Sequence, residues 1–120
     1  MDKADFENLL IWQKAMDYAD YCVSISEIIS ERKKKHYRIL EQLESSSLSV
    51  AQNIAEGKGR YSTKEFLQFL YYARGSLNES LTVLILLDRR KWITREENMK
   101  TKNMAYELGS MLNGFINGLK

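Results

Sequence analysis

Residues 52–66 read Gln52-Asn53-Ile54-Ala55-Glu56-Gly57-Lys58-Gly59-Arg60-Tyr61-Ser62-Thr63-Lys64-Glu65-Phe66, and they separate two long predicted helices. We call this stretch the corner. Gly57 is typical of the left-handed residue that follows a helix C-terminus. Ser62 and Glu65 match a capping box, in which the serine oxygen accepts the Glu65 amide hydrogen and the Glu65 side chain reaches back. With Gly59, these residues predict a cap and a turn between the two helices.

Outward from the corner, apolar side chains recur every three or four residues, as on one face of a helix. The spacing predicts helices over about 5–30, 36–56, 62–91 and 94–120. The chain has no proline and only six glycines, which favours long helices with short connections. The connection around Trp92 is so short that its helices must be antiparallel neighbours. The predicted fold is all-α: an antiparallel up-down four-helix bundle in a single domain, residues 1–120.

The third predicted helix also carries apolar side chains beside its main stripe: Leu67, Tyr71, Tyr72, Val83 and Leu86. One four-helix core does not easily absorb this much apolar surface, and excess apolar surface usually marks a protein contact. We therefore expect a homo-oligomer. The alternative is a thick core with tyrosines at its rim.

Residues suited to catalysis or metal binding are scarce. The single histidine, His36, and the single cysteine, Cys22, exclude a zinc site of the His/Cys type. No Glu-x-x-His pair of a di-iron bundle occurs, and no base stands beside the Ser45–Ser47 cluster to activate a nucleophile. The two glycines of the corner lack the pattern of a nucleotide-binding loop. We expect no enzyme activity, no catalytic residue, no metal and no cofactor, and a packed thiol at Cys22.

The net charge is only +2, from 18 basic and 16 acidic residues, but the bases are clustered. One cluster is Arg32, Lys33, Lys34 and Lys35 with Arg38, and another is Arg89-Arg90-Lys91 with Arg95. Both lie at predicted helix ends, where the helix dipole alone favours bases. Lys58, Arg60 and Lys64 lie in the corner, and Arg74 follows in the third helix. The predicted nucleic-acid-binding residues are Lys58, Arg60, Lys64 and Arg74, with Arg32, Lys33, Lys34 and Lys35 as an auxiliary patch.

The corner also contains residues with a structural interpretation. Asn53 is expected to bond to a neighbouring helix or to the turn backbone, and Glu56 to cap or to pair with Arg60 or Arg74. Asn53, Glu56, Gly57 and Gly59 would then fix the geometry of the corner without a ligand. Tyr61 offers a ring that could stack on a base. The alternative is a solvated turn with a packed tyrosine.

No membrane or export signal is visible. The first residues contain no apolar stretch of a signal peptide, and the longest apolar run, residues 84–87, is far too short to span a bilayer. We expect a cytoplasmic protein with no membrane partner.

Several stretches together resemble the four-helix-bundle family of 23S ribosomal-RNA intervening-sequence proteins. They are Leu10-Ile11-Trp12-Gln13-Lys14-Ala15, Ser49-Val50-Ala51-Gln52-Asn53-Ile54-Ala55-Glu56-Gly57, Gly59-Arg60, Lys64-Glu65-Phe66 with Phe69-Leu70, and Ala73-Arg74-Gly75-Ser76-Leu77 with Glu79. The likeness covers most of the chain. It departs from the family around Ala51, where a proline is usual, and after the first helix, where Phe-Pro is common.

The resemblance implies an antiparallel four-helix bundle that assembles into a ring-like homopentamer. It implies no established enzyme activity, and related accessory proteins bind nucleic acid and a reverse transcriptase. Two hypotheses follow from the residues and the resemblance together. In the first, the protein is a non-enzymatic oligomer that binds structured RNA or a nucleoprotein partner. In the second, it is a protein-interaction scaffold that acts through its homo-oligomeric surface without binding nucleic acid.

Overall fold

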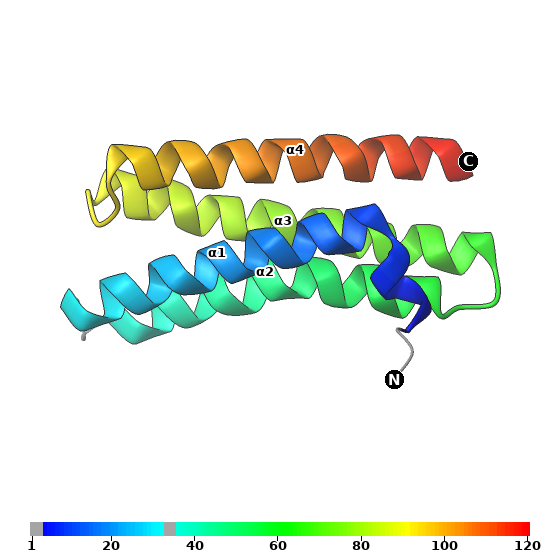
Figure 1. Ribbon diagram of the computed structural model, residues 1–120, viewed down its shortest axis with the longest axis horizontal. Coiled ribbons are helices and arrows are strands. Elements are labelled where there is room, and N and C mark those ends of the chain that lie inside the picture. The colour runs from blue at the N-terminus through cyan, green and yellow to red at the C-terminus, as the bar shows by residue number, and fades with distance from the viewer. Residues whose placement is uncertain (1–3, 33–35) are drawn as a thin grey trace.

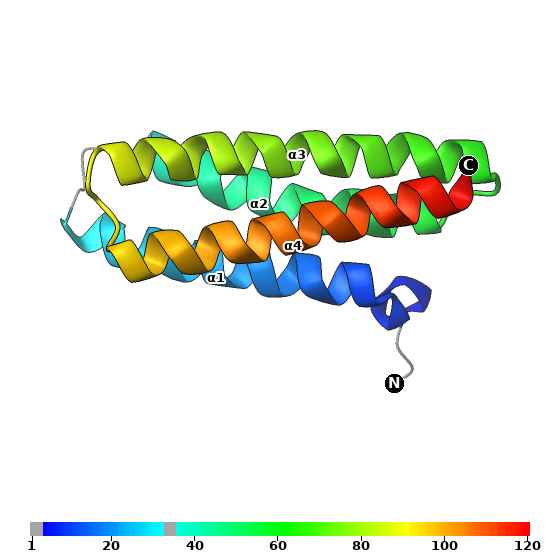
Figure 2. The ribbon, with the colours of Figure 1, turned by 90° about the horizontal axis from the view of Figure 1, so that it is seen from above.

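The computed structural model describes residues 4–32 and 36–120 (Figure 1). A short 3-10 turn, η1 (Asp5–Asn8), precedes four long helices: α1 (Leu10–Arg32), α2 (Tyr37–Lys58), α3 (Thr63–Arg89) and α4 (Arg95–Leu119). Successive helices run in opposite directions (Figures 1 and 2). The described residues contain no strand, and the predicted all-α bundle is confirmed.

Each long helix packs against two others, so the four helices surround one core. The α2 helix contacts α1 and α3, and α4 contacts the same two helices from the other side. The longest dimension of the bundle is 45 Å. Within the described ranges, no helix is long and apolar enough to cross a membrane.

The first helix begins later than the sequence predicts. Leu9 has an extended backbone, with φ −76° and ψ 122°, and separates η1 from α1. The Glu7 carboxylate accepts the Ala4 amide hydrogen at 2.7 Å, and Gln13 donates to the Glu7 carbonyl at 2.8 Å. Local side-chain bonds therefore replace the first turns of the predicted helix.

The prediction of a left-handed cap at Gly57 is wrong. No described glycine has a positive φ; α2 continues to Lys58, and its C-cap is Gly59 with φ −81°. Gly57 is buried, and a Cβ added there would lie 2.7 Å from the Phe69 Cβ and 2.9 Å from the Phe66 Cδ1. The missing side chain thus lets α2 approach α3 closely just before the turn.

Side-chain caps begin α3 and α4 as predicted, with one difference. Ser62 Oγ accepts the Glu65 amide hydrogen at 3.1 Å, but the Glu65 carboxylate accepts from the Ser62 hydroxyl instead of the Ser62 backbone. The capping box at Thr94 is complete, because Glu97 accepts the Thr94 amide hydrogen at 2.7 Å and Thr94 accepts from Glu97 at 3.1 Å.

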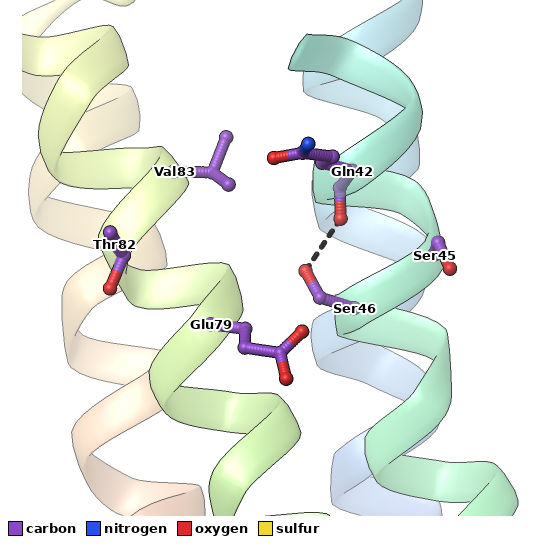
Figure 3. Close-up of a pocket in the computed structure, with 6 residues that line it drawn as sticks. All are labelled: Gln42, Ser45, Ser46, Glu79, Thr82 and Val83. Atoms are coloured by element: carbon purple, nitrogen blue, oxygen red, sulfur yellow. Dashed lines mark hydrogen bonds between the residues drawn. The ribbon is translucent and has the colours of Figure 1, made fainter. Parts of the chain in front are cut away.

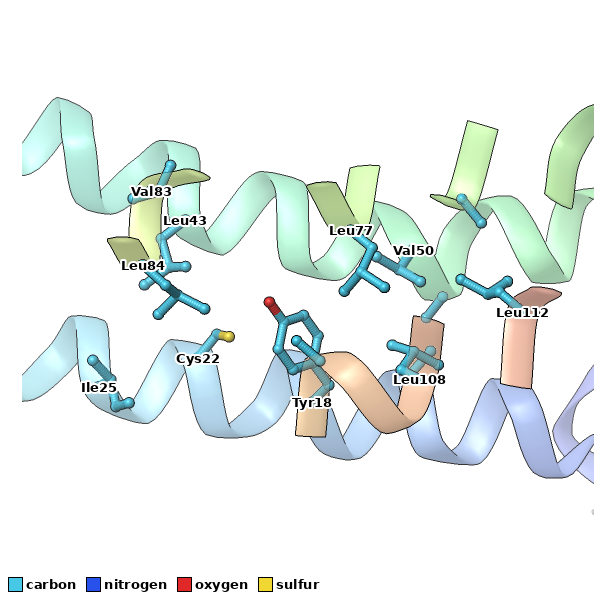
Figure 4. Packing of buried hydrophobic residues seen from close by; sticks show 14 of the residues in the cluster. Tyr18, Cys22, Ile25, Leu43, Val50, Leu77, Val83, Leu84, Leu108 and Leu112 are labelled. Atoms are coloured by element: carbon cyan, nitrogen blue, oxygen red, sulfur yellow. The ribbon is translucent and has the colours of Figure 1, made fainter. Parts of the chain in front are cut away.

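The core is mostly aliphatic (Figure 4). It also contains a buried polar cluster. Tyr18 and Ser80 are completely buried, and their hydroxyl oxygens lie 2.6 Å apart. Ser80 donates its only hydrogen to the Leu77 carbonyl at 2.7 Å, so Tyr18 must donate to Ser80. Cys22 is buried beside Tyr18, and burial raises the pKa of its thiol to about 12. The predicted packed thiol is confirmed.

Candidate nucleic-acid interface

The corner lies at the end of the bundle where α2 turns into α3 (Figure 1). Lys58 ends α2 and Lys64 lies in the first turn of α3. Both side chains are exposed, and neither forms an ion pair within the described residues. The two lysines therefore present free positive charges on the two sides of the turn.

Arg60 lies between these lysines but is engaged by the protein itself. Its guanidinium donates to the Glu56 carboxylate and lies 4.7 Å from the centre of the Phe69 ring. The predicted pairing of Glu56 with Arg60 is confirmed. An exposed pair of this kind contributes little stability, but it partly neutralises the charge that a phosphate would meet. Arg60 is thus a weaker phosphate ligand than either lysine.

Arg74 does not join the corner. Its guanidinium lies 5.0 Å from the centre of the Tyr71 ring and donates to the Asn113 Oδ1 of α4 at 3.1 Å. Its position is ten residues after Lys64, or about 15 Å along α3. Arg74 instead borders a 550 Å³ hollow between α3 and α4, whose other lining residues are Leu77, Asn78, Leu81, Ala105, Tyr106, Gly109, Ser110 and Asn113.

The prediction that Asn53 bonds to a neighbouring helix or to the turn backbone is wrong, because both of its hydrogen bonds go to Ser49 of its own helix. The Asn53 Nδ2 donates to the Ser49 carbonyl at 2.9 Å and to Ser49 Oγ at 3.0 Å. Ser49 Oγ lies 2.9 Å from Ser76 Oγ of α3. Asn53 therefore bonds within its own helix, and Ser49 makes the link to the neighbouring helix.

A second hollow opens on the corner itself, with a volume of 340 Å³. It is lined by Ala55, Glu56, Gly59, Arg60, Tyr61 and Glu65. Tyr61 is fully exposed, so the alternative of a packed tyrosine is wrong, and its ring is available for stacking. Two carboxylates in the lining make this hollow poor for a phosphate, which would sit outside it, near the lysines.

Only Arg32 of the auxiliary basic patch lies among the described residues, and it is at the opposite end of the bundle from the corner. Arg32 is the last residue of α1, while Lys33, Lys34 and Lys35 lie outside the described residues. The 22 residues of α2 separate this end from the corner, which corresponds to about 33 Å. Arg32 is therefore far from the bases of the corner.

A hollow of 310 Å³ lies between α2 and α3 (Figure 3), and no pattern in the sequence predicts it. Its lining is Gln42, Ser45, Ser46, Glu79, Thr82 and Val83. Ser46 donates to the Gln42 carbonyl and Thr82 to the Asn78 carbonyl, so both hydroxyls are satisfied within their own helices. In the part of the chain that the structure describes, no three His, Cys, Asp or Glu side chains gather as a metal site.

The sequence model of the 23S rRNA-intervening sequence protein family matches residues 7–114. The chain belongs to this family. One solved structure, from Bacteroides thetaiotaomicron VPI-5482, is described as a protein of unknown function from the S23 ribosomal protein family. It is 26% identical, with 89% of this chain and 98% of that chain covered and a TM-score of 0.83. Among proteins with curated descriptions, no match is found.

The family match confirms the resemblance that the corner and the third helix carry. It includes the corner and the links at both ends of the bundle. The solved relative is described as a protein of unknown function, so its likeness establishes the fold, whereas the family is shown by the sequence model.

Proposed function

We propose that the protein is a non-enzymatic homo-oligomeric bundle that binds structured RNA, free or within a nucleoprotein, through phosphate contacts at the corner. Lys58 and Lys64 are the main phosphate ligands, with Arg60 and Tyr61 beside them. The proposal rests chiefly on these two exposed lysines, which form no ion pair with any residue that the structure describes. Free cations on a protein surface attract the phosphate backbone independently of sequence.

The start of α3 adds to this site. The first amides of a helix point outward and carry a partial positive charge, which favours a phosphate nearby. The Glu65 amide already donates its hydrogen to the Ser62 oxygen. The lysines, rather than the helix end, therefore supply most of the attraction for a phosphate. Tyr61 can stack on an unpaired base of a loop or bulge, where proteins commonly recognise RNA.

Removing the two lysine charges should weaken RNA binding and its dependence on salt. For Lys58→Gln/Lys64→Gln we expect the slope of log affinity against log salt to fall by about 1.5–2, because two phosphate contacts are lost. Fluorescence anisotropy of a labelled RNA hairpin, titrated between roughly 50 and 200 mM salt, measures this slope.

The matched control is Lys14→Gln/Lys102→Gln, which removes the same charge away from the corner. Lys14 lies 3.3 Å from Glu107 in an exposed ion pair, so its loss costs little stability. The salt slope of this double variant should stay within about 0.5 of the native value. Native protein that binds the hairpin with no salt dependence, or fails to bind at low salt, contradicts the proposed function.

The second candidate is the protein-interaction scaffold, and exposed apolar side chains favour it. Of the side chains that predicted oligomerisation, Val83 is buried and Leu67 and Tyr71 are half-buried, whereas Tyr72 and Leu86 are 50% and 41% exposed. These last two are 14 residues apart and so lie on the same face of α3. They offer a self-association surface that the single-chain core does not use.

Light scattering tests the oligomer that both candidates share. A homopentamer of 14.0 kDa chains has a mass of about 70 kDa. Tyr72→Lys/Leu86→Lys should reduce this mass, because two charges would be buried at the interface. A native monomer at micromolar concentration contradicts both candidates. A stable oligomer that does not bind RNA contradicts the RNA-binding function and supports the protein-interaction scaffold.

A further inference from the structure

The end of the bundle opposite the corner gathers two basic segments that are far apart in the sequence. The last turn of α1, the first turn of α2 and the link between α3 and α4 all lie at this end (Figure 2). The ring of His36, which precedes α2, and that of Trp92, in the α3–α4 link, lie 4.4 Å apart between centres. This contact brings Arg38 of α2 and the bases around Trp92 to the same end of the molecule.

The described bases here are largely uncommitted. Five are exposed and form no ion pair within the described residues: Arg38, Arg89, Arg90, Lys91 and Arg95. Arg38 interacts only with its neighbour Tyr37 among the described residues: its Nε donates to the Tyr37 hydroxyl at 3.5 Å, and its guanidinium lies 6.0 Å from the ring centre. Asp88 is half-buried, and Glu97 accepts the Thr94 amide hydrogen. The corner, by contrast, has two such free bases.

The backbone of the α3–α4 link adds an independent observation at Lys91. Lys91 has φ 58°, the one positive φ among the described residues other than glycine. Its amide donates to the Asp88 carbonyl at 3.0 Å, and the Trp92 amide donates to the Leu87 carbonyl at 2.9 Å. This is the Schellman motif, whose left-handed position is usually glycine because a Cβ is strained there.

A lysine at this position needs an explanation other than folding. Its ammonium group forms no ion pair with any described residue. Arg89 and Arg90 already place bases at the helix C-terminus, where the dipole favours them. Strained residues that persist often serve a binding function. The Lys91 side chain is exposed, and Lys91 directly precedes Trp92, whose ring contacts His36.

We propose that Arg38, Arg89, Arg90, Lys91 and Arg95 form a second phosphate-binding surface for RNA, centred on Lys91 and separate from the corner. We call it the Lys91 end. It rests on the proposed function, because it binds the same class of ligand. About 33 Å of α2 lies between the two surfaces, so each contacts a different part of the RNA. Tyr37, 55% exposed, offers a stacking ring at this end, as Tyr61 does at the corner.

The test compares three variants in the anisotropy titration with the RNA hairpin. Lys91→Gly should lower the salt slope by about 0.7–0.9, and Arg89→Gln/Arg90→Gln/Lys91→Gly by about 2–3. Combining the triple variant with Lys58→Gln/Lys64→Gln should add the two losses, since distant sites act independently. Thermal unfolding provides a second readout, in which Lys91→Gly should raise the midpoint by about 3 °C as strain is removed.

The outcomes separate this inference from the proposed function. An unchanged slope in the triple variant, with a reduced slope in the corner variant, overturns the Lys91 end and leaves the proposed function intact. Absence of RNA binding by the native protein removes both. Vesicles containing phosphatidylserine supply another polyanion, and preferential binding to them over the hairpin overturns RNA as the ligand. A lower midpoint of thermal unfolding for Lys91→Gly would overturn the inference, because it would show that the lysine stabilises the helix end.

Discussion

Gly57→Ala is expected to lower the free energy of unfolding by about 3 kcal/mol, at the upper end of what overpacking usually costs. The added Cβ would lie 2.7 Å from the Phe69 Cβ, 2.9 Å from the Phe66 Cδ1 and 3.3 Å from the Phe66 carbonyl oxygen. Two of these atoms belong to or adjoin the α3 backbone, so a rotamer change cannot remove the clash. The two helices must therefore separate at Gly57.

Gly75→Ala in α3 is the matched control, because α3 is the helix that packs against Gly57 of α2. Nothing lies within 4 Å of a Cβ at Gly75, which is exposed in the middle of α3. Alanine should therefore raise the free energy of unfolding by about 0.5–1 kcal/mol through its higher helix propensity. Urea unfolding followed by circular dichroism measures both changes. Equal effects of the two substitutions would show that the close approach at Gly57 is not a source of stability.

Ser80→Ala is expected to cost about 2 kcal/mol, because the buried Tyr18 hydroxyl loses its acceptor. Tyr18 is completely inside the core and donates to Ser80 at 2.6 Å. The neighbouring Cys22 thiol is only a weak acceptor and cannot replace the serine oxygen. The same urea experiment measures the loss.

Two further variants show whether the loss comes from the unsatisfied hydroxyl. Thr82→Ala removes an exposed hydroxyl from the same helix and should change stability by less than about 0.5 kcal/mol. Tyr18→Phe/Ser80→Ala removes both partners and should recover part of the loss relative to Ser80→Ala alone. If the double variant is as unstable as the sum of its single variants, the hydrogen bond is not the cause.

The fold was predictable because its determinants are local or periodic. Apolar spacing, the absence of proline and the caps at Ser62 and Thr94 all act within one or two helical turns. The error at Gly57 has a different origin. A glycine near a helix end fits both a left-handed cap and a close helix crossing, and only the distance to α3 distinguishes them. The sequence carries no such distance.

The candidate site was predictable only in part. The free lysines of the corner follow from their place in the turn, and Glu56 four residues before Arg60 predicts their pairing. The contact of Arg74 with Asn113 and that of His36 with Trp92 join residues 39 and 56 positions apart, so no local pattern indicates them. Nothing in the sequence predicts the positive φ of Lys91, because this position lacks the glycine that usually indicates such a turn.

Chemical footprinting of lysines is the most direct test of the central claim, that RNA contacts the two ends of the bundle. The native protein would be acetylated with and without the RNA hairpin, and modification at each lysine measured by mass spectrometry. We expect protection of Lys58, Lys64 and Lys91, with Lys14 and Lys102 modified equally in both samples. Protection of Lys14 and Lys102 with none at the three end lysines, in protein saturated with RNA, would contradict the account.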